Sequence, residues 1–338
     1  MKKRLIITLL ILAACLISIY FGLASLSSQD DLYSDRPEGC VGVMPIRQIN
    51  PIFVEAAPSI LFRFDTGSDF STITQNDLKK LEAAGCKIET MFYPSLGRGA
   101  KGQTHITTRR YRVTLPLHLY NYDTDSLDQT HERLIKESRN DLHNVDFTES
   151  VTGFSVLGID FIEKFNIVYM NNEQAIALYF DRPEGYQDLA KLKPSISPLT
   201  FPYLGHRYYM DVTIDRKVNS YFLDTGLQYV HFRLPSAERK RSKRKLEDIR
   251  VRDLNGTYDA KVDKNAWIEV GNRAGSQYAY YYDLSNEEDY AFNPYNMFQQ
   301  NVLLDFKSKA LALKPFCVLP KRHFTLRPDS VELENSSY

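Results

Sequence analysis

The stretch ILFRFDTGSDFSTIT, from Ile60 to Thr74, decides the fold of this chain. It begins as an apolar, strand-like run and then carries the tripeptide DTG at Asp65 to Gly67. A buried strand can carry a carboxylate to its exposed end, and glycine lets the chain turn so that a backbone N–H approaches that carboxylate. A single motif of this kind is more often an ordinary turn, because Asp and Gly dominate turns.

The motif occurs twice. The stretch SYFLDTGLQYVHF, from Ser220 to Phe232, repeats an apolar strand followed by DTG at Asp224 to Gly226. Each copy opens a half of the chain that later carries a hairpin-like segment and a closing group of strand-like runs. A repeated order of this kind predicts an internal duplication, with one carboxylate contributed by each half.

Composition sets the class of protein. The 338 residues are 43% hydrophobic and 25% charged, which is enough for two globular domains. Tyr and Phe are abundant, at 22 and 19, and helix-favouring blocks are few, so we expect an all-β protein with short helices. Basic and acidic residues balance at 42 each, which gives no reason to expect a nucleic-acid partner.

The N-terminus differs from the rest. MKKR precedes an uncharged apolar stretch from Leu5 to Leu26, close to the roughly 20 residues that a membrane-spanning helix needs. The basic cluster marks the cytoplasmic side. We therefore expect a single-pass N-terminal transmembrane helix with the globular part outside the cytoplasm, in the periplasm or a comparable space. A cleaved signal peptide, and a lipoprotein site that lipidates Cys15, remain alternatives.

The chain divides into four parts. Residues 1–36 form the predicted membrane anchor and tether, residues 37–191 the first lobe, residues 192–320 the second lobe, and residues 321–338 a polar tail. The proline-rich stretch KLKPSISPLTFPYLG separates the lobes, and the boundary falls near Leu192.

Two local segments have clear patterns. TQNDLKKLEAAG has helical spacing, with Thr74 or Asn76 as its cap and Gly85 as its end. The acidic stretch from Asn121 to Ser150 has few apolar residues, so we expect a surface insertion there.

Cysteine and histidine give no metal pattern. Cys40, Cys86 and Cys317 follow the anchor, and three cysteines allow at most one disulfide among them. The seven histidines are scattered, and no spacing typical of a metal site is present. We expect no metal and no cofactor.

The doubled motif resembles the aspartic proteases, which are bilobal in the pepsins and have compact motifs in retropepsin-like bacterial members. FDTGSDFSTIT, LDTGLQYVHF, SVLGIDFIEKFNIVYM and the closing strands of both halves carry the resemblance, over about Cys40 to Pro320. It implies a two-lobed acid-protease-like β-barrel fold in which Asp65 and Asp224 form the catalytic pair and share one proton. It implies a peptide or protein substrate, no cofactor and no obligatory dimer.

The resemblance also implies supporting roles. Thr66 and Thr225 would hydrogen-bond across the lobe interface, and Gly67 and Gly226 would offer backbone N–H groups to the carboxylates. Ser68 would donate to the outer oxygen of Asp65 and favour its ionised form. Leu227 occupies the corresponding place in the second half and has no donor, although retroviral enzymes of this family accept alanine there.

The substrate-covering flap is expected around Gly97, Gly99 and Gly102, with Tyr93 as the nearest candidate for a flap tyrosine. In the second half, the Asn-Gly pair within Leu254 to Thr257 predicts a tight hairpin. Asn293 stands where the family usually has glycine, and asparagine tolerates a left-handed backbone.

These features predict a membrane-tethered aspartic endopeptidase. The alternative is a noncatalytic relative that keeps the fold and binds a peptide or an envelope partner. A weaker alternative is a processing protein that acts on itself or on one partner.

Overall fold

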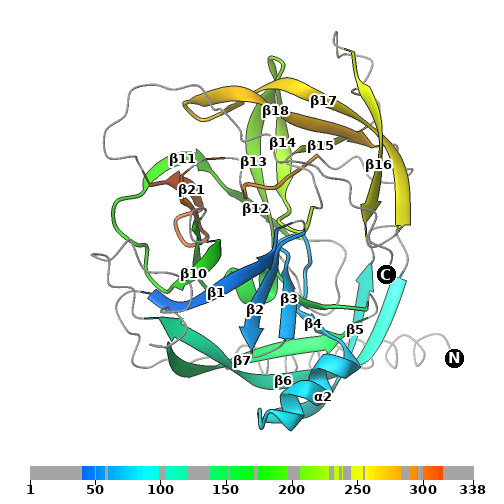
Figure 1. Cartoon of the computed structure of the whole chain (residues 1–338), viewed down its shortest axis with the longest axis vertical. Helices are drawn as coiled ribbons and strands as arrows, with labels where there is room; N and C mark the ends of the chain where they lie inside the picture. Colours follow the sequence, from blue (N-terminus) through cyan, green and yellow to red (C-terminus); the bar gives the residue numbers. More distant parts are fainter. Residues whose placement is uncertain are drawn as a thin grey trace, which may run out of the picture.

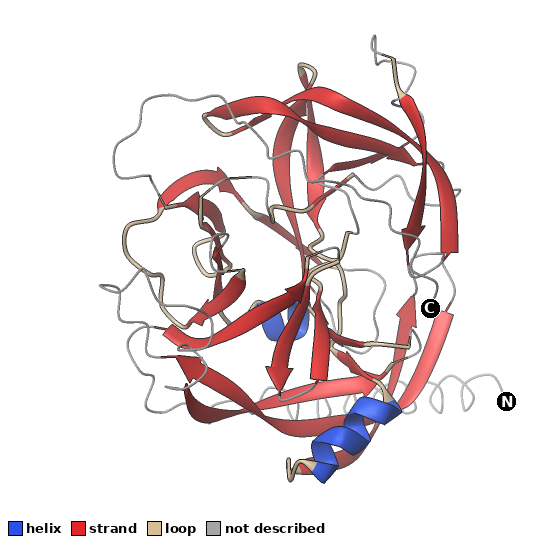
Figure 2. Cartoon of the chain, viewed as in Figure 1, coloured by secondary structure: helices blue, strands red, loops and turns tan. Residues whose placement is uncertain are grey.

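The fold is known from a computed structural model. It describes residues 40–49, 51–57, 60–98, 104–120, 138–150, 153–170, 174–196, 206–227, 232–235, 238, 245–253, 256–282, 290–295, 298 and 300–314. Within these ranges the chain is mostly β-strand, with two helices, α2 (Gln75–Ala83) and α4 (Ile159–Ile162) (Figure 2). The expectation of an all-β protein with short helices is confirmed.

The larger of two sheets has the strand order β11-β21-β20-β9-β10-β1-β2-β3-β8-β4-β7-β6-β5 (Figure 1). Its strands are β1 (Cys40–Gln48), β2 (Phe53–Ala57), β3 (Ile60–Phe64), β4 (Thr72–Ile73), β5 (Ile88–Arg98), β6 (Thr104–Tyr120), β7 (Ser138–Glu149), β8 (Ser155–Leu157), β9 (Asn166–Met170), β10 (Ala175–Tyr179), β11 (Gln187–Lys191), β20 (Val302–Asp305) and β21 (Ala310–Leu313).

The second sheet has the order β12-β13-β14-β19-β15-β18-β17-β16. Its strands are β12 (Lys193–Ile196), β13 (His206–Ile214), β14 (Lys217–Leu223), β15 (Phe232–Pro235), β16 (Glu247–Asp253), β17 (Gly256–Val270), β18 (Arg273–Tyr282) and β19 (Ala291–Phe292). In Figure 1 most of this sheet lies above the larger one.

The strand orders of the two sheets contain the same seven-strand unit. The run β2-β3-β8-β4-β7-β6-β5 in the first corresponds to β13-β14-β19-β15-β18-β17-β16 in the second. The directions agree as well: β3–β8 and β14–β19 are parallel, β4–β8 and β15–β19 are antiparallel, and β4–β7 and β15–β18 are parallel. The internal duplication predicted from the doubled motif is therefore present in the topology, with DTG following β3 in one unit and β14 in the other.

The chain changes sheet at the predicted boundary. β11 ends at Lys191 in the larger sheet, β12 begins at Lys193 in the second, and Leu192 between them is buried. Residues 192–320 do not all stay with the second unit, however. β20 and β21 return to the larger sheet, where β20 pairs with β9 and β21 with β11. The two halves are thus joined by strand pairing as well as by the connector.

Each unit buries a stacked pair of aromatic rings. Phe62 stacks on Phe147 with ring centroids 5.6 Å apart, and Phe232 stacks on Phe292 at 5.0 Å. All four side chains are fully buried and belong to one continuous hydrophobic cluster that contains residues of both halves. Burial of large aromatic rings is a major source of stability, so the core fixes both units beneath the two DTG motifs.

Two local predictions have different outcomes. Helix α2 begins after Thr74, whose hydroxyl accepts from the N–H of Asp77, and Gly85 follows its end with φ +83°, so that prediction is confirmed. The surface insertion is wrong for residues 138–149, because β7 pairs with β6 from Ser138 to Thr148, continues beside β4, and buries Val145 and Phe147. Residues 121–137 lie outside the described ranges.

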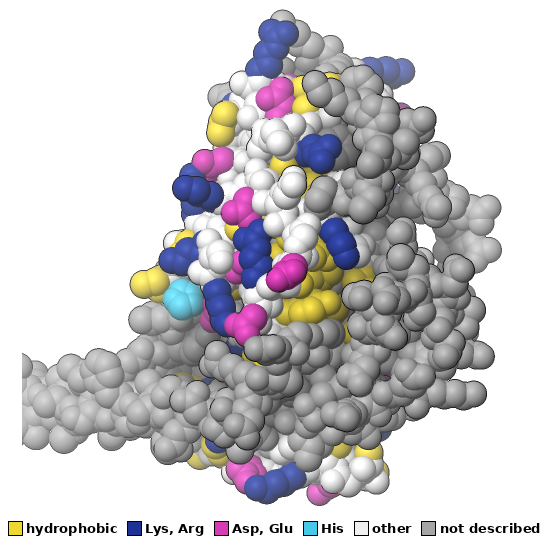
Figure 3. Space-filling view, turned by 90° about the vertical axis from the view of Figure 1, so that its left-hand side faces the viewer, with side chains coloured by type: hydrophobic (Ala, Val, Ile, Leu, Met, Phe, Trp, Pro, Cys, Tyr) yellow, Lys and Arg dark blue, Asp and Glu magenta, His cyan; other side chains and the backbone are white. Residues whose placement is uncertain are grey.

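The predicted membrane anchor and the polar tail also lie outside the described residues, as do Cys15 and Cys317. Among the residues that are described, no helix is long and apolar enough to cross a membrane. Cys86 is a free thiol. The face shown in Figure 3 has acidic and basic side chains interspersed over its described part, in keeping with the balanced composition.

Candidate active site

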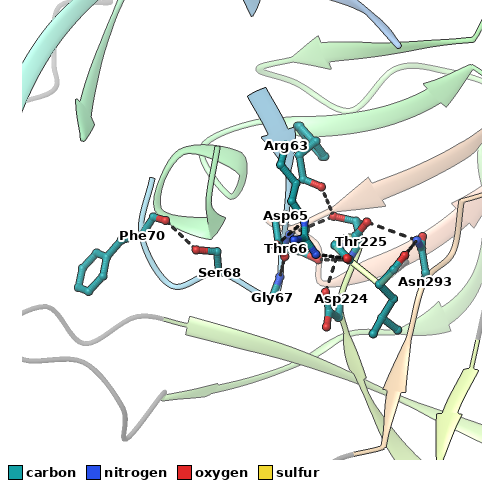
Figure 4. Close-up of polar contacts among 12 residues, drawn as sticks. Arg63, Asp65, Thr66, Gly67, Ser68, Phe70, Asp224, Thr225 and Asn293 are labelled. Carbon is teal, nitrogen blue, oxygen red and sulfur yellow. Dashed lines mark hydrogen bonds and ion pairs between the residues drawn. The ribbon is translucent and has the colours of Figure 1, made fainter. Parts of the chain in front are cut away.

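The two DTG motifs leave their sheets at equivalent points. The Asp65 N–H donates to the carbonyl of Leu157 at the end of β8, at 3.0 Å. The Asp224 N–H donates to the carbonyl of Phe292 at the end of β19, at 2.9 Å. Each aspartate is therefore fixed by a parallel strand neighbour, and the two motifs lie side by side (Figure 4).

Two threonines lock the motifs to each other. Thr66 Oγ1 donates to the carbonyl of Leu223, and Thr225 Oγ1 donates to the carbonyl of Phe64, both at 2.9 Å. Each hydroxyl also accepts from the backbone N–H of the other threonine, at 3.0 Å. Both threonines are buried, so these four hydrogen bonds connect the two units without competition from water.

Two glycines allow the carboxylates to converge. The N–H of Gly67 donates to Asp65 Oδ1 at 2.9 Å, and that of Gly226 donates to Asp224 Oδ1 at 3.0 Å. A Cβ on Gly67 would lie 2.6 Å from Asp224 Oδ1 and 3.0 Å from Asp65 Oδ1. A Cβ on Gly226 would lie 2.3 Å from Asp65 Cγ. Both carboxylates thus reach the same small space, which only glycine leaves open.

Burial and mutual repulsion decide the charge of the pair. Burial, and then the charge of Asp65, raise the pKa of Asp224 to about 7, while Arg233 and Arg63 act in the opposite direction. Two like charges in so small a space do not ionise independently, and the pair holds one proton over the intermediate pH range. At that stage the arrangement offers one carboxylate as a base and one carboxyl group as an acid.

Arg63 is the residue that the sequence analysis missed. It lies two positions before Asp65 in β3, on the same side of the strand, and it is 7% exposed. Its Nε lies 3.2 Å from Asp65 Oδ2, and its Nη2 donates to the carbonyl of Gly226 in the other motif. The signal in the sequence was a charged residue in an otherwise apolar strand, at even spacing from the aspartate.

Ser68 does not have its expected role. Its hydroxyl donates to the carbonyl of Phe70 at 2.8 Å, within the loop that follows the motif, and not to Asp65 (Figure 4). This loop packs against Gly158, where a Cβ would lie 2.4 Å from the backbone carbon of Phe70. The hydroxyl therefore shapes the loop, and Arg63 is the side chain that contacts the outer oxygen of Asp65.

Asn293 occupies the position in the second unit that Gly158 occupies in the first. Its φ is not positive, so the tolerance of asparagine for a left-handed backbone is not used here. Its amide is used instead: Nδ2 donates to the carbonyls of Thr225 at 3.3 Å and Leu227 at 3.5 Å, and Oδ1 accepts from the N–H of Tyr295 at 2.9 Å. The amide fixes the second motif by side-chain hydrogen bonds.

The segment expected to be a flap is a hairpin. β5 and β6 pair antiparallel, with Gly97 opposite His105, while Gly99 and Gly102 lie outside the described residues. Tyr93 is 6% exposed and its ring centroid lies 4.9 Å from the Arg110 guanidinium, so it packs within the hairpin's base.

The equivalent hairpin of the second unit joins β16 and β17. Asp253 pairs with Gly256, so a hairpin is present where the Asn-Gly pair predicted one. Leu254 and Asn255 lie outside the described residues.

The described residues do not contain a cluster of metal-binding side chains. Among the described residues, no three His, Cys, Asp or Glu side chains gather in a group that could hold a metal ion.

Comparison with models of known protein families finds no match, and no curated protein matches the sequence. The functional assignment therefore depends on the geometry of Asp65 and Asp224.

Proposed function

We propose that this protein is an aspartic endopeptidase of two lobes, tethered to a membrane by its N-terminal segment and facing an extracytoplasmic space. One observation carries the proposal: two equivalent units deliver Asp65 and Asp224 to the same small space, with reciprocal hydrogen bonds between Thr66 and Thr225 beneath them. Such an arrangement serves a reaction that needs a base and an acid at one point.

The reaction is hydrolysis of a peptide bond by a water held between the carboxyl groups. The ionised carboxylate takes a proton from the water as its oxygen attacks the carbonyl carbon. The protonated carboxyl group donates its proton to the carbonyl oxygen, which gives a neutral tetrahedral diol. In the second step the carboxyl group that took the proton from the water gives it to the amide nitrogen, the other carboxylate takes a proton from one hydroxyl of the diol, and the C–N bond breaks to release a carboxylic acid and an amine, which leaves one proton on the pair.

The surroundings assign the roles within the pair. Arg63 lies against Asp65, and burial raises the pKa of Asp224 to about 7. We therefore place the charge on Asp65 and the proton on Asp224 in the resting enzyme. The substrate would lie extended beneath the β5–β6 hairpin, because an extended peptide can pair with exposed strand backbone.

The test uses the full-length chain purified in mild detergent and a mixed peptide library, assayed from acidic to neutral pH. We expect cleavage by the wild type and a loss of roughly 10²- to 10⁴-fold in Asp65→Asn and in Asp224→Asn, because each removes an acid–base group. Asp305→Asn is the matched control, since Asp305 is also fully buried but lies in β20. Full activity in both active-site variants would exclude the proposal.

A second candidate is a noncatalytic peptide-binding protein with the same architecture. The contact between Arg63 and Asp65 favours it, because a guanidinium beside the carboxylate occupies one oxygen that a catalytic water would otherwise reach. Binding of library peptides without cleavage at any pH would support this function and exclude the first.

A further inference from the structure

We propose that Arg63 is a positioning residue that sets the protonation state of the aspartate pair and joins Asp65 to the backbone of the opposite motif. The inference rests on the proposed function for its catalytic meaning. The role itself, one buried guanidinium that keeps one of two carboxyl groups charged, depends only on the contacts around Arg63.

The contacts reach both halves of the chain. Nε of Arg63 lies 3.2 Å from Asp65 Oδ2, and Nη2 donates to the carbonyl of Gly226, 163 residues away. The guanidinium carbon also lies 5.7 Å from the ring centroid of Phe154. The side chain is therefore held on one side by an aromatic ring and on the other by both DTG motifs.

The hydrogen bonding of Arg63 argues against a purely structural role. Nε and Nη1 are buried, and neither makes a hydrogen bond within the described part of the chain. Nε still faces the Asp65 carboxylate, whereas Nη1 is a buried donor without a partner in the described part of the chain; such a donor is destabilising, and a hydrophobic side chain of similar volume would avoid that penalty. What a hydrophobic side chain cannot supply is a positive charge beside Asp65.

The other groups around the pair do not replace this charge at Asp65. Arg233 from β15 acts on Asp224, as Arg63 does. Burial raises the pKa of Tyr169 from β9, and the charge of Asp65 makes a smaller contribution in the same direction. Within the described residues, the cation in contact with Asp65 is Arg63. Two carboxyl groups, Arg63 and Arg233 are thus the charged groups that determine how the pair titrates.

The consequence is a defined pH window. Arg63 favours the ionised forms of the pair, so its removal moves both proton-binding steps of the pair to higher pH. An opposite charge at this distance shifts a carboxyl group by about one pH unit or more. Without Arg63, the active single-proton state would be reached only at higher pH.

The first test compares pH profiles of kcat/KM for the full-length wild type, Arg63→Gln and Arg63→Lys. We expect both limbs of the Arg63→Gln profile to move up by about one pH unit or more. Arg63→Lys keeps the charge and should keep the limbs near their wild-type positions, while kcat falls because the fork that joins Asp65 and Gly226 is lost.

Arg110→Gln is the matched control. Arg110 is also 7% exposed, has an Asp146 oxygen at 3.4 Å and lies over the ring of Tyr93, but it is not among the groups that act on the pair. Its removal should lower stability and leave the limbs in place. Unmoved limbs in Arg63→Gln, or an equal shift in Arg110→Gln, would overturn the inference. If Arg63→Gln does not fold, a full upward shift of both limbs of the pH profile in Arg63→Lys, which keeps the charge, would also overturn the inference.

The second test does not need activity. The pH dependence of unfolding, measured by urea denaturation, reports proton uptake by the pair whether or not the protein cleaves peptides. In Arg63→Gln, the fall in the free energy of unfolding with rising pH should extend to higher pH than in the wild type. An inactive wild type that shows this difference refutes the proposed function and keeps the role of Arg63; an unchanged pH range refutes that role.

Discussion

Thr66 and Thr225 make the same two hydrogen bonds in opposite directions. Each hydroxyl donates to the carbonyl two residues before the other threonine at 2.9 Å, and each accepts from the other's N–H at 3.0 Å. The matched distances are those expected when two equivalent units meet through the same groups on each side. Because each hydroxyl both donates and accepts a hydrogen bond, removal of either hydroxyl leaves backbone groups of the opposite unit unpaired.

Thr66→Val should lower the free energy of unfolding by about 1–3 kcal/mol, because valine keeps the shape but leaves the Leu223 carbonyl and the Thr225 N–H without their partners. Thr225→Val should have a similar effect, and the double variant should lose less than the sum, because each single variant already breaks part of the same network. Urea denaturation of the three variants measures this. Thr66→Ser, which keeps the hydroxyl, is the control, and additive losses would contradict the coupling.

Gly226→Ala should abolish cleavage, because the new Cβ would lie 2.3 Å from Asp65 Cγ and must displace that carboxylate. Gly185→Ala is the control: Gly185 has φ +81° but no atom within 4 Å of the new Cβ, so only backbone strain of about 1 kcal/mol is expected, with no change in activity. The measurements are peptide cleavage and thermal unfolding. Wild-type activity in Gly226→Ala would mean that the carboxylates do not need this convergence.

Asp224 should make the fold less stable as the pH rises. Burial and the charge of Asp65 raise its pKa to about 7 from the ordinary value of 3.8, so between these values the folded state binds a proton that the unfolded state has lost. Stability from this group is therefore complete below the unfolded value and is lost as the pH rises through the folded one. Asp224→Asn should be more stable than the wild type at neutral pH, by about 1 kcal/mol or more.

The same variant should also have a weaker dependence of stability on pH. Some dependence should remain, because burial raises the pKa of Asp160 to about 6 and gives a slope of the same sign. Urea denaturation across the acidic and neutral range measures both effects, with Asp305→Asn as the control for the loss of a buried carboxylate elsewhere. A variant that is less stable than the wild type at neutral pH would contradict the prediction.

Asn293→Gly should destabilise the protein by about 1–3 kcal/mol, although glycine is the residue that the resemblance to aspartic proteases leads one to expect there. The amide of Asn293 contacts the carbonyls of Thr225 and Leu227 and the N–H of Tyr295, and glycine replaces none of these contacts. The reciprocal change, Gly158→Asn, should be worse, because its Cβ would lie 2.4 Å from the Phe70 carbonyl carbon. Thermal unfolding of both variants tests whether the equivalent positions are interchangeable; a neutral Asn293→Gly would show that the amide contacts are dispensable.

Features with a local cause could be predicted from the sequence. Thr74 and Gly85 mark the ends of helix α2, because a hydroxyl cap and a left-handed glycine act on their own neighbours in the chain. The two copies of DTG identified both aspartates, and their order along the chain predicted the duplication that the sheets show. Leu192 was identified as the boundary because the proline-rich connector begins there.

Features that depend on contacts between distant residues were decided only by the tertiary structure. The few apolar residues of β7 indicate a surface segment when the sequence is considered alone. They belong to a core strand only because β6 lies beside them. β20 and β21 return to the larger sheet through pairing with β9 and β11, which no local pattern specifies. The Ser68 hydroxyl donates to the Phe70 carbonyl in a loop that packs against Gly158, a contact that the order of residues does not specify.

Arg63 is the clearest example of a residue whose role depends on the tertiary structure. The sequence by itself determined that two carboxylates end two similar strands, because apolar spacing and the DTG turn depend only on residues that are neighbours in the chain. Whether an arginine in one of those strands faces solvent or a buried carboxylate depends on Gly226 and Phe154, far along the chain, and on the low polarity of the space that they enclose. Only the packed structure brings these groups together, and only there does the charge of Arg63 act on the pair.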